Sequence, residues 1–126
     1  MAEEKKRILV VDDEEEALGH LRNILERANY AVISTTKGAE VLNLAKLNRP
    51  DLIILDVFLP DLEGGEVAAK LAEDPACMNI PVIFLSGIVM TKTDKFSGDK
   101  FGRHYILAKP VTQKEILDMV SKVLSL

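Results

Sequence analysis

Hydrophobic residues occur along the chain in five short, continuous runs rather than at alternating positions. Continuous runs are typical of strands that are buried on both faces of a parallel sheet. The expected strands are Ile8 to Val11, Ala31 to Ile33, Leu52 to Leu55, Val82 to Leu85 and Tyr105 to Ala108.

Four of the segments between and after these runs have hydrophobic residues at helical spacing. The second helix is expected to start near Lys37 and to end before Asn48, because Pro50 disfavours helical geometry in the residue before it. The third is expected at 63–73, and the last from about Thr112, where Glu115 three residues later completes a capping-box pattern. The residues expected to face inward are Leu18, Leu21, Leu25 and Ala28 in the first helix; Val41, Leu44, Ala45 and Leu47 in the second; and Ile116, Leu117, Val120, Val123 and Leu124 in the last.

The alternation of strand and helix predicts an α/β fold, a doubly wound parallel sheet with helices on both faces. A closed barrel of eight βα units would need roughly 200 residues or more. The segment 87–103 has no clear pattern, and a short or irregular fourth helix is expected there.

Length and composition are those of one globular domain, which we expect to span residues 1–126. A hydrophobic content of 48% and a charged content of 29% are near globular averages and argue against disorder. The net charge of −4 argues against direct nucleic-acid binding. The single Cys77, the absence of an apolar signal segment and the absence of a long apolar stretch predict a cytoplasmic protein without membrane insertion.

Polar residues follow the apolar runs at the points where the strands end. Asp12 and Asp13 follow the first run, Asp56 the third, Ser86 the fourth and Lys109 the fifth. The carboxyl ends of parallel strands share one edge of the sheet, where open α/β sheets bind ligands. We therefore expect these residues to converge.

Crowded carboxylates need a cationic partner, because two of them about 4 Å apart repel by about 1 kcal/mol in water and about 4 kcal/mol at an effective dielectric of 20. Lys109 supplies one positive charge. Oxygen ligands without histidine or cysteine favour Mg²⁺, which pairs naturally with a phosphoryl group. A carboxylate beside Mg²⁺, an ammonium group and a hydroxyl can attack phosphorus and form an aspartyl phosphate.

Taken in order, these residues resemble the receiver domain of two-component response regulators, in particular the single-domain chemotaxis-regulator type. The resemblance covers nearly the whole chain, from about Lys6 onward. It depends on Asp12-Asp13, the segment from Asp51 to Gly64 that contains Asp56 and Pro60, Ser86-Gly87 and Lys109-Pro110. The resemblance implies a flavodoxin-like five-stranded sheet in the order 2-1-3-4-5.

It also implies the phosphorylation chemistry. Asp56 would accept phosphate from a phosphohistidine, so the chain would catalyse its own phosphorylation and dephosphorylation without being a conventional enzyme. Asp13, the Asp56 side chain and the backbone carbonyl of Phe58 would bind Mg²⁺, and Asp12 would assist largely through water.

The remaining implied roles concern the phosphoryl group. Ser86 would donate a hydrogen bond to one of its oxygens and Lys109 would pair with another, while the small Gly87 would leave the phosphorus accessible. The Lys109-Pro110 peptide bond would be cis.

The implied partners are a sensor histidine kinase or a histidine phosphotransfer protein, and a downstream protein that reads the surface. Since little chain follows the last expected helix, the output is expected to pass through that second protein. The sequence does not decide whether phosphorylation causes the protein to form a dimer.

Other interpretations compete with these assignments. Asp13 could cap the first helix, Ser86 could be a turn hydroxyl and Lys109 a surface charge. A pseudo-receiver would keep the fold and bind a partner without phosphorylation. An Asp-nucleophile phosphatase would need a second acid where Phe58 stands, and the glycine-rich nucleotide-binding motifs are absent.

The sequence departs from the family pattern at the residues that respond to phosphorylation, which are called the switch residues. Receivers usually carry an aromatic residue three positions before the lysine, and here that residue is Ile106, with Tyr105 one position earlier. Neighbouring strand residues face opposite sides. Either a bulge or one extra residue in the loop before the strand restores Tyr105, or the protein switches, through Ser86 and the fifth strand, without an aromatic residue.

Overall fold

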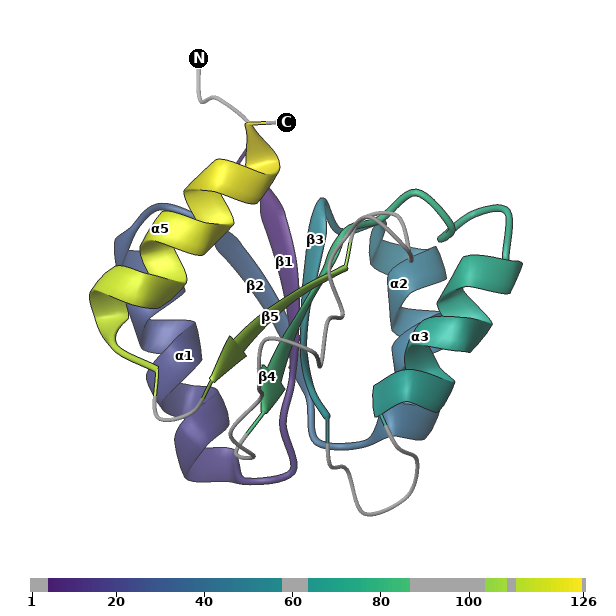
Figure 1. Ribbon diagram of the computed structural model, residues 1–126, viewed down its shortest axis with the longest axis horizontal. Helices are drawn as coiled ribbons and strands as arrows, with labels where there is room; N and C mark the ends of the chain where they lie inside the picture. The colour runs from purple at the N-terminus through teal and green to yellow at the C-terminus, as the bar shows by residue number, and fades with distance from the viewer. Residues whose placement is uncertain (1–4, 58–63, 87–103, 109–110, 126) are drawn as a thin grey trace.

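The computed structural model describes residues 5–57, 64–86, 104–108 and 111–125. Strands and helices alternate along the chain (Figure 1). The strands are β1 Arg7–Val11, β2 Ala31–Thr35, β3 Leu52–Asp56, β4 Val82–Ser86 and β5 His104–Ala108; the helices are α1 Glu15–Arg27, the 3₁₀ turn Gly38–Glu40, α2 Val41–Asn48, α3 Gly64–Glu73 and α5 Gln113–Leu124. The irregular fourth helix expected at 87–103 lies outside the described residues.

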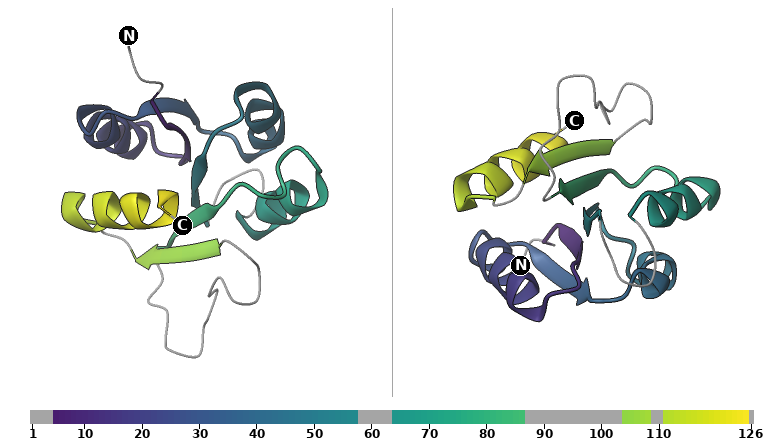
Figure 2. Two further views of the ribbon diagram at one scale, coloured as in Figure 1. Left: turned by 90° about the horizontal axis from the view of Figure 1, so that it is seen from above. Right: turned by 60° about the horizontal axis from the view of Figure 1, so that its bottom comes forward.

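All five strands pair in parallel, in the order β2-β1-β3-β4-β5. The expected α/β doubly wound sheet and its strand order are therefore confirmed. Helices α1 and α5 cover one face and α2 and α3 the other, as the views in Figure 2 make clear. The central strands β3 and β4 are buried at every position, as continuous apolar runs predict.

Two hydrophobic cores result, one on each side of the sheet. One core combines alternate strand residues with Leu18, Leu21, Ile24 and Leu25 of α1 and Ile116, Val120 and Val123 of α5. The other combines the remaining strand residues with Val41, Ala45, Val67, Ala68 and Leu71. Leu117 and Leu124 pack at the edge of the first core and Leu44 at the edge of the second.

Two inward-facing assignments were wrong. Ala28 is exposed, because α1 ends at Arg27 and the chain turns at Asn29, which has a positive φ of 77°. Leu47 has 79% of its surface exposed, because it lies about 120° around the helix from the buried Val41 and about 160° from the buried Ala45, on the outer face of α2. Arg49, with φ of 49°, then ends that helix and leads into β3.

The expected capping box at α5 is confirmed. The Glu115 backbone N–H donates to Thr112 Oγ1 at 3.1 Å, and the Thr112 backbone N–H donates to Glu115 Oε1 at 2.9 Å. The two bonds fix where α5 begins after β5. Among the described helices, none has the length and apolarity that crossing a bilayer requires.

Candidate functional site

Three aspartates lie together at the carboxyl edge of the sheet. Asp12 follows β1 directly, Asp13 comes next, and Asp56 is the last residue of β3. Since β1 and β3 are neighbours with Val11 opposite Leu55, the carboxylates approach to within 4.8 Å of one another, one oxygen from each. We call this set the acid cluster.

Burial differs within the acid cluster. Asp12 is fully buried and Asp56 is 5% exposed, while Asp13 is exposed. Buried carboxylates are costly unless partners stabilise them. The arrangement therefore has a protected inner pair of acids and one acid that faces solvent.

Backbone contacts hold Asp12 in place. Its own N–H donates to the Thr35 carbonyl at 3.3 Å, which extends the β1–β2 pairing, and its Oδ1 accepts from the Glu14 N–H at 3.0 Å. The N-terminal cap of α1 is Glu14, without a side-chain capping bond. The alternative in which Asp13 merely caps this helix is therefore wrong.

Thr35 is a residue near the site that the sequence analysis missed. The second strand was expected to end at Ile33, but it extends to Thr35, which is 7% exposed. Its hydroxyl donates to Glu40 at 2.5 Å and accepts from the Lys37 N–H at 3.1 Å. The β-branched side chain of Thr35, a residue type enriched in strands, was the signal that the strand continues.

Ser86 is the last residue of β4 and is 2% exposed. The strand next to it supports Asp56, since the Val57 N–H donates to the Leu85 carbonyl at 3.0 Å. Ser86 is thus part of a strand, rather than a turn residue, and ends at the same edge as the acid cluster. Ala108 lies opposite it on β5.

Several predicted site residues fall outside the described part of the chain. They are Phe58, Gly87, Lys109 and Pro110. Their roles stay predictions.

Tyr105 and Ile106 face opposite sides of the sheet. The β4–β5 register runs without a bulge from His104 to Ala108. Tyr105 packs against the core beneath α1 and α5, whereas Ile106 packs against the core beneath α2 and α3. The explanation by a bulge in this strand is therefore wrong, and Ile106 occupies the side on which an aromatic residue was expected.

The acid cluster fits a hard divalent cation. All three groups offer carboxylate oxygens within 4.8 Å of one another, and such oxygens suit Mg²⁺. Each pair of charges at this distance repels by about 1 kcal/mol in water, and by more near the buried acids. A bound Mg²⁺ would offset that repulsion and would orient a phosphoryl oxygen.

Comparison with known proteins identifies the family. The family model for the response regulator receiver domain matches residues 8–121. The chain therefore belongs to the receiver domains of two-component response regulators.

Individual relatives agree with this assignment. The chain is 38% identical over 119 residues to the alkaline phosphatase synthesis transcriptional regulatory protein PhoP of Bacillus subtilis, covering 94% of this chain and 48% of PhoP. It is 32% identical to the polar-differentiation response regulator DivK of Brucella anthropi, covering 94% of this chain and 96% of DivK. It thus spans about half of one relative and nearly all of the other.

A solved structure has the same fold. The crystal structure of a putative response regulator from Chloroflexus aurantiacus is 28% identical, with a TM-score of 0.86, and covers 98% of this chain and all of that one. Receiver domains of this family typically bind Mg²⁺ at an acidic pocket, and they interact with histidine kinases and downstream targets.

Proposed function

We propose that Asp56 is the phosphoacceptor of this receiver domain, in a reaction that depends on Mg²⁺. The observation that carries the proposal is the acid cluster, in which a nearly buried aspartate at the end of β3 lies beside two further carboxylates. The family assignment supports it. We also propose that residues 1–126 form one such domain.

In this proposal an Asp56 oxygen attacks the phosphorus of a phosphohistidine. A P–O bond forms while the P–N bond breaks, and the imidazole leaves with the electron pair and regains a proton. Mg²⁺, when bound, would neutralise charge on the transferred oxygens. Asp12, Asp13 and the Phe58 carbonyl are the other residues we assign to it.

The product would be held by residues from the neighbouring strand ends. We assign the buried hydroxyl of Ser86 to one phosphoryl oxygen and the ammonium group of Lys109 to another, with Gly87 leaving room for water in the reverse reaction. Support comes from Ser86, which ends β4 at the edge that holds the acid cluster. The lysine follows Ala108, which lies opposite that serine.

The partners we propose are a histidine kinase or a histidine phosphotransfer protein as donor and a downstream protein as target. We propose that they meet in the cytoplasm. The signal would move Ser86 and the end of β5, with Ile106 rather than an aromatic residue on the side of α2 and α3. We therefore expect a response that does not depend on rotation of Tyr105.

The test is incubation of the full chain with acetyl phosphate or phosphoramidate in the presence of Mg²⁺. Intact-protein mass spectrometry should show a gain of one phosphoryl group that hydroxylamine removes. Asp56→Asn should abolish the gain, and Asp51→Asn, which changes an exposed aspartate at the other end of β3, should keep it. A gain that survives Asp56→Asn would refute the assignment.

A pseudo-receiver is the second candidate, favoured by the irregular sequence of the segment 87–103, which suggests an unusual surface for a partner. Such a protein would bind its partner without turnover. Mg²⁺ titration separates the two candidates, because a pseudo-receiver should show no saturable binding that Asp13→Ala abolishes.

A further inference from the structure

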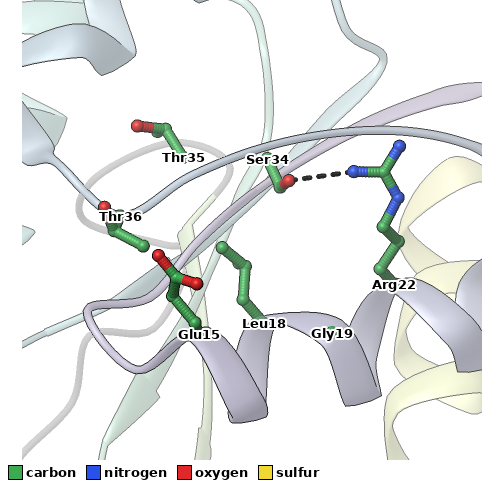
Figure 3. Close-up of a pocket in the computed structure, with 7 residues that line it drawn as sticks. All are labelled: Glu15, Leu18, Gly19, Arg22, Ser34, Thr35 and Thr36. Atoms are coloured by element: carbon green, nitrogen blue, oxygen red, sulfur yellow. Dashed lines mark hydrogen bonds between the residues drawn. The ribbon is translucent and has the colours of Figure 1, made fainter.

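Thr35 lies at the end of β2, with its side chain on the side of the sheet that α2 and α3 cover. Figure 3 shows this side chain pointing away from α1, whereas Ser34 beside it accepts a hydrogen bond from Arg22 of α1 at 3.1 Å. Neighbouring strand residues face opposite sides, and Ile33, two residues before Thr35, packs against the core beneath α2 and α3. Thr35 is 7% exposed, so its hydroxyl needs partners within the protein.

The Thr35 hydroxyl joins the end of β2 to the start of α2. It donates to Glu40 Oε1 at 2.5 Å and accepts from the Lys37 N–H at 3.1 Å. Glu40 is the N-cap residue of α2, but its side chain does not cap that helix and reaches back to the strand instead. The hydroxyl therefore ties the end of the strand to the turn that follows it.

The backbone of Thr35 holds Asp12. The Asp12 N–H donates to the Thr35 carbonyl at 3.3 Å, which continues the pairing of β1 with β2 past Val11. Within the described part of the chain β2 pairs with no strand other than β1, so no second ladder of hydrogen bonds steadies its end. The position of this carbonyl therefore depends on the contacts that the Thr35 hydroxyl makes.

Asp12 is sensitive to such a shift because it is fully buried in the acid cluster. Its Oδ1 accepts from the Glu14 N–H at 3.0 Å, and its carboxylate lies within 4.8 Å of those of Asp13 and Asp56. Mg²⁺ requires nearly ideal octahedral geometry and tolerates displaced ligands poorly. A small movement of the Asp12 backbone therefore changes how well the acid cluster fits the ion.

We propose that Thr35 is a positioning residue for Mg²⁺ binding at the acid cluster. Its hydroxyl, held by Glu40, fixes the end of β2, and its carbonyl passes this constraint to the Asp12 backbone. Neither Thr35 nor Glu40 is assigned as a ligand of the ion. The inference rests on the proposed function, because it concerns the metal site of that reaction.

The experiment is titration of the full chain with MgCl₂ by isothermal titration calorimetry. Thr35→Val keeps a β-branched side chain that suits a strand but removes the hydroxyl. The Mg²⁺ dissociation constant should rise by roughly 10-fold, the lower end of what loss of an outer-shell partner costs. Thr35→Ser keeps the hydroxyl and should stay within about 2-fold of wild type.

Thr36→Val is the matched control. It makes the same chemical change at the next residue, which lines a groove beside α1 together with Glu15 (Figure 3). This variant should bind Mg²⁺ as the wild type does, because its hydroxyl lies on the α1 side of the strand.

Two substitutions at Glu40 separate the hydrogen bond from the charge. Glu40→Gln keeps an acceptor oxygen for Thr35 without the charge and should leave the Mg²⁺ dissociation constant within about 2-fold of wild type. Glu40→Ala removes the acceptor and should weaken binding as Thr35→Val does. The double variant should bind no more weakly than Thr35→Val alone, because both changes break the same bond.

Two measurements without metal distinguish positioning from a general loss of stability. The Asp12 amide proton should exchange faster in Thr35→Val, relative to the amides of β3, and should not do so in Thr36→Val. Urea denaturation in a chelator gives the free energy of unfolding. A purely structural role would lower that free energy and leave the Mg²⁺ dissociation constant of the folded variant unchanged.

The outcomes for Thr35 and for the metal site can be told apart. Equal dissociation constants for the wild type and Thr35→Val would overturn this inference and leave the phosphorylation of Asp56 unaffected. Binding by Thr35→Ser as weak as that by Thr35→Val would also overturn it, because the hydroxyl would not then be the cause. A wild-type chain without saturable Mg²⁺ binding would refute the metal site and this inference together.

Discussion

Charged side chains have hydrogen-bond or ion-pair partners at the amino end of the parallel sheet, whereas charges of one sign are crowded together at its carboxyl end. At the amino end Asp51 accepts from the Arg7 N–H at 2.8 Å, and the Arg7 guanidinium donates to the Asn48 carbonyl at 2.6 Å. Lys46 pairs with Asp74 at 3.4 Å on the same end. These charged side chains are at least partly exposed. Each has a partner, which is either a group of opposite charge or a backbone N–H or carbonyl group.

At the carboxyl end the acid cluster places three charges of one sign within 4.8 Å, and two of the three are buried. Such crowding is unfavourable in itself, and a bound cation, which receiver domains typically hold at an acidic pocket, would offset it. One end of the sheet is thus arranged for stability and the other for binding. The contrast can be tested by changing aspartates at both ends.

The largest effect is expected on metal binding. Asp13→Ala removes one carboxylate ligand and should weaken Mg²⁺ binding by roughly 100-fold or more, since even second-shell changes cost 10–100-fold. Isothermal titration calorimetry measures this. Asp51→Ala is the matched control at the amino end and should bind Mg²⁺ as the wild type does; equal affinity in both variants would contradict the site.

At the amino end, loss of a charge should destabilise the fold. Asp51→Ala removes the acceptor of the Arg7 N–H and should lower the free energy of unfolding by about 1 kcal/mol. Urea denaturation gives the value. An unchanged midpoint would mean that solvent replaces this bond at no cost.

At the carboxyl end, loss of a charge should have the opposite sign. Asp13→Asn relieves repulsion in the acid cluster and should raise the free energy of unfolding by about 1 kcal/mol in the presence of a chelator. Mg²⁺ should cancel the advantage, because it stabilises the wild type more than the variant. A variant less stable than wild type in the chelator would show that repulsion does not dominate there.

The smallest effect concerns Cys77, a buried thiol in the loop before β4. Burial, reinforced by the Asp74 carboxylate, raises the pKa of this thiol above its ordinary value of 9.0. As the pH rises past 9.0, the Cys77 thiol loses its proton in the unfolded chain before it does so in the folded chain. The free energy of unfolding therefore declines between pH 9 and the folded-state pKa, by at most about 1.4 kcal/mol per pH unit.

The check is to measure unfolding of the wild type and Cys77→Ala from pH 8 to pH 10. The variant should be less stable at pH 8 because it leaves a cavity, and its deficit should narrow above pH 9. A deficit that stays constant would show that the thiol does not titrate differently in the two states.

The element order, and the edge of the sheet at which the acids lie, could be predicted because both depend on local signals. Continuous apolar runs indicate buried parallel strands, and the residue after such a run lies at the carboxyl edge wherever the helices are placed. That Asp12 and Asp13 lie next to Asp56 depends in addition on β1 and β3 being neighbours, a strand order that came from the resemblance to receiver domains and not from a local signal.

The errors lie where tertiary context decides. Apolar character placed Leu47 inward, but the core contacts the face of α2 that carries Val41 and Ala45, and Leu47 lies on the other side of the helix. Polar residues ended the second strand too early, although Thr35 pairs with Val11 and is buried there. The face of Tyr105 depends on the β4–β5 register, which no local signal in the sequence specifies.

The β4–β5 register also limits how an aromatic residue could be brought to the other face of β5. Side chains of a strand change face when it slips by one residue, so a slip of β5 would bring Tyr105 to the side of α2 and α3. The same slip would displace Ala108 from Ser86 and would move the lysine that follows it. By contrast, an aromatic residue substituted at position 106 would lie on the side of α2 and α3 while the pairing of Ala108 with Ser86 stays unchanged, so point substitution is the direct route to an aromatic switch in this fold.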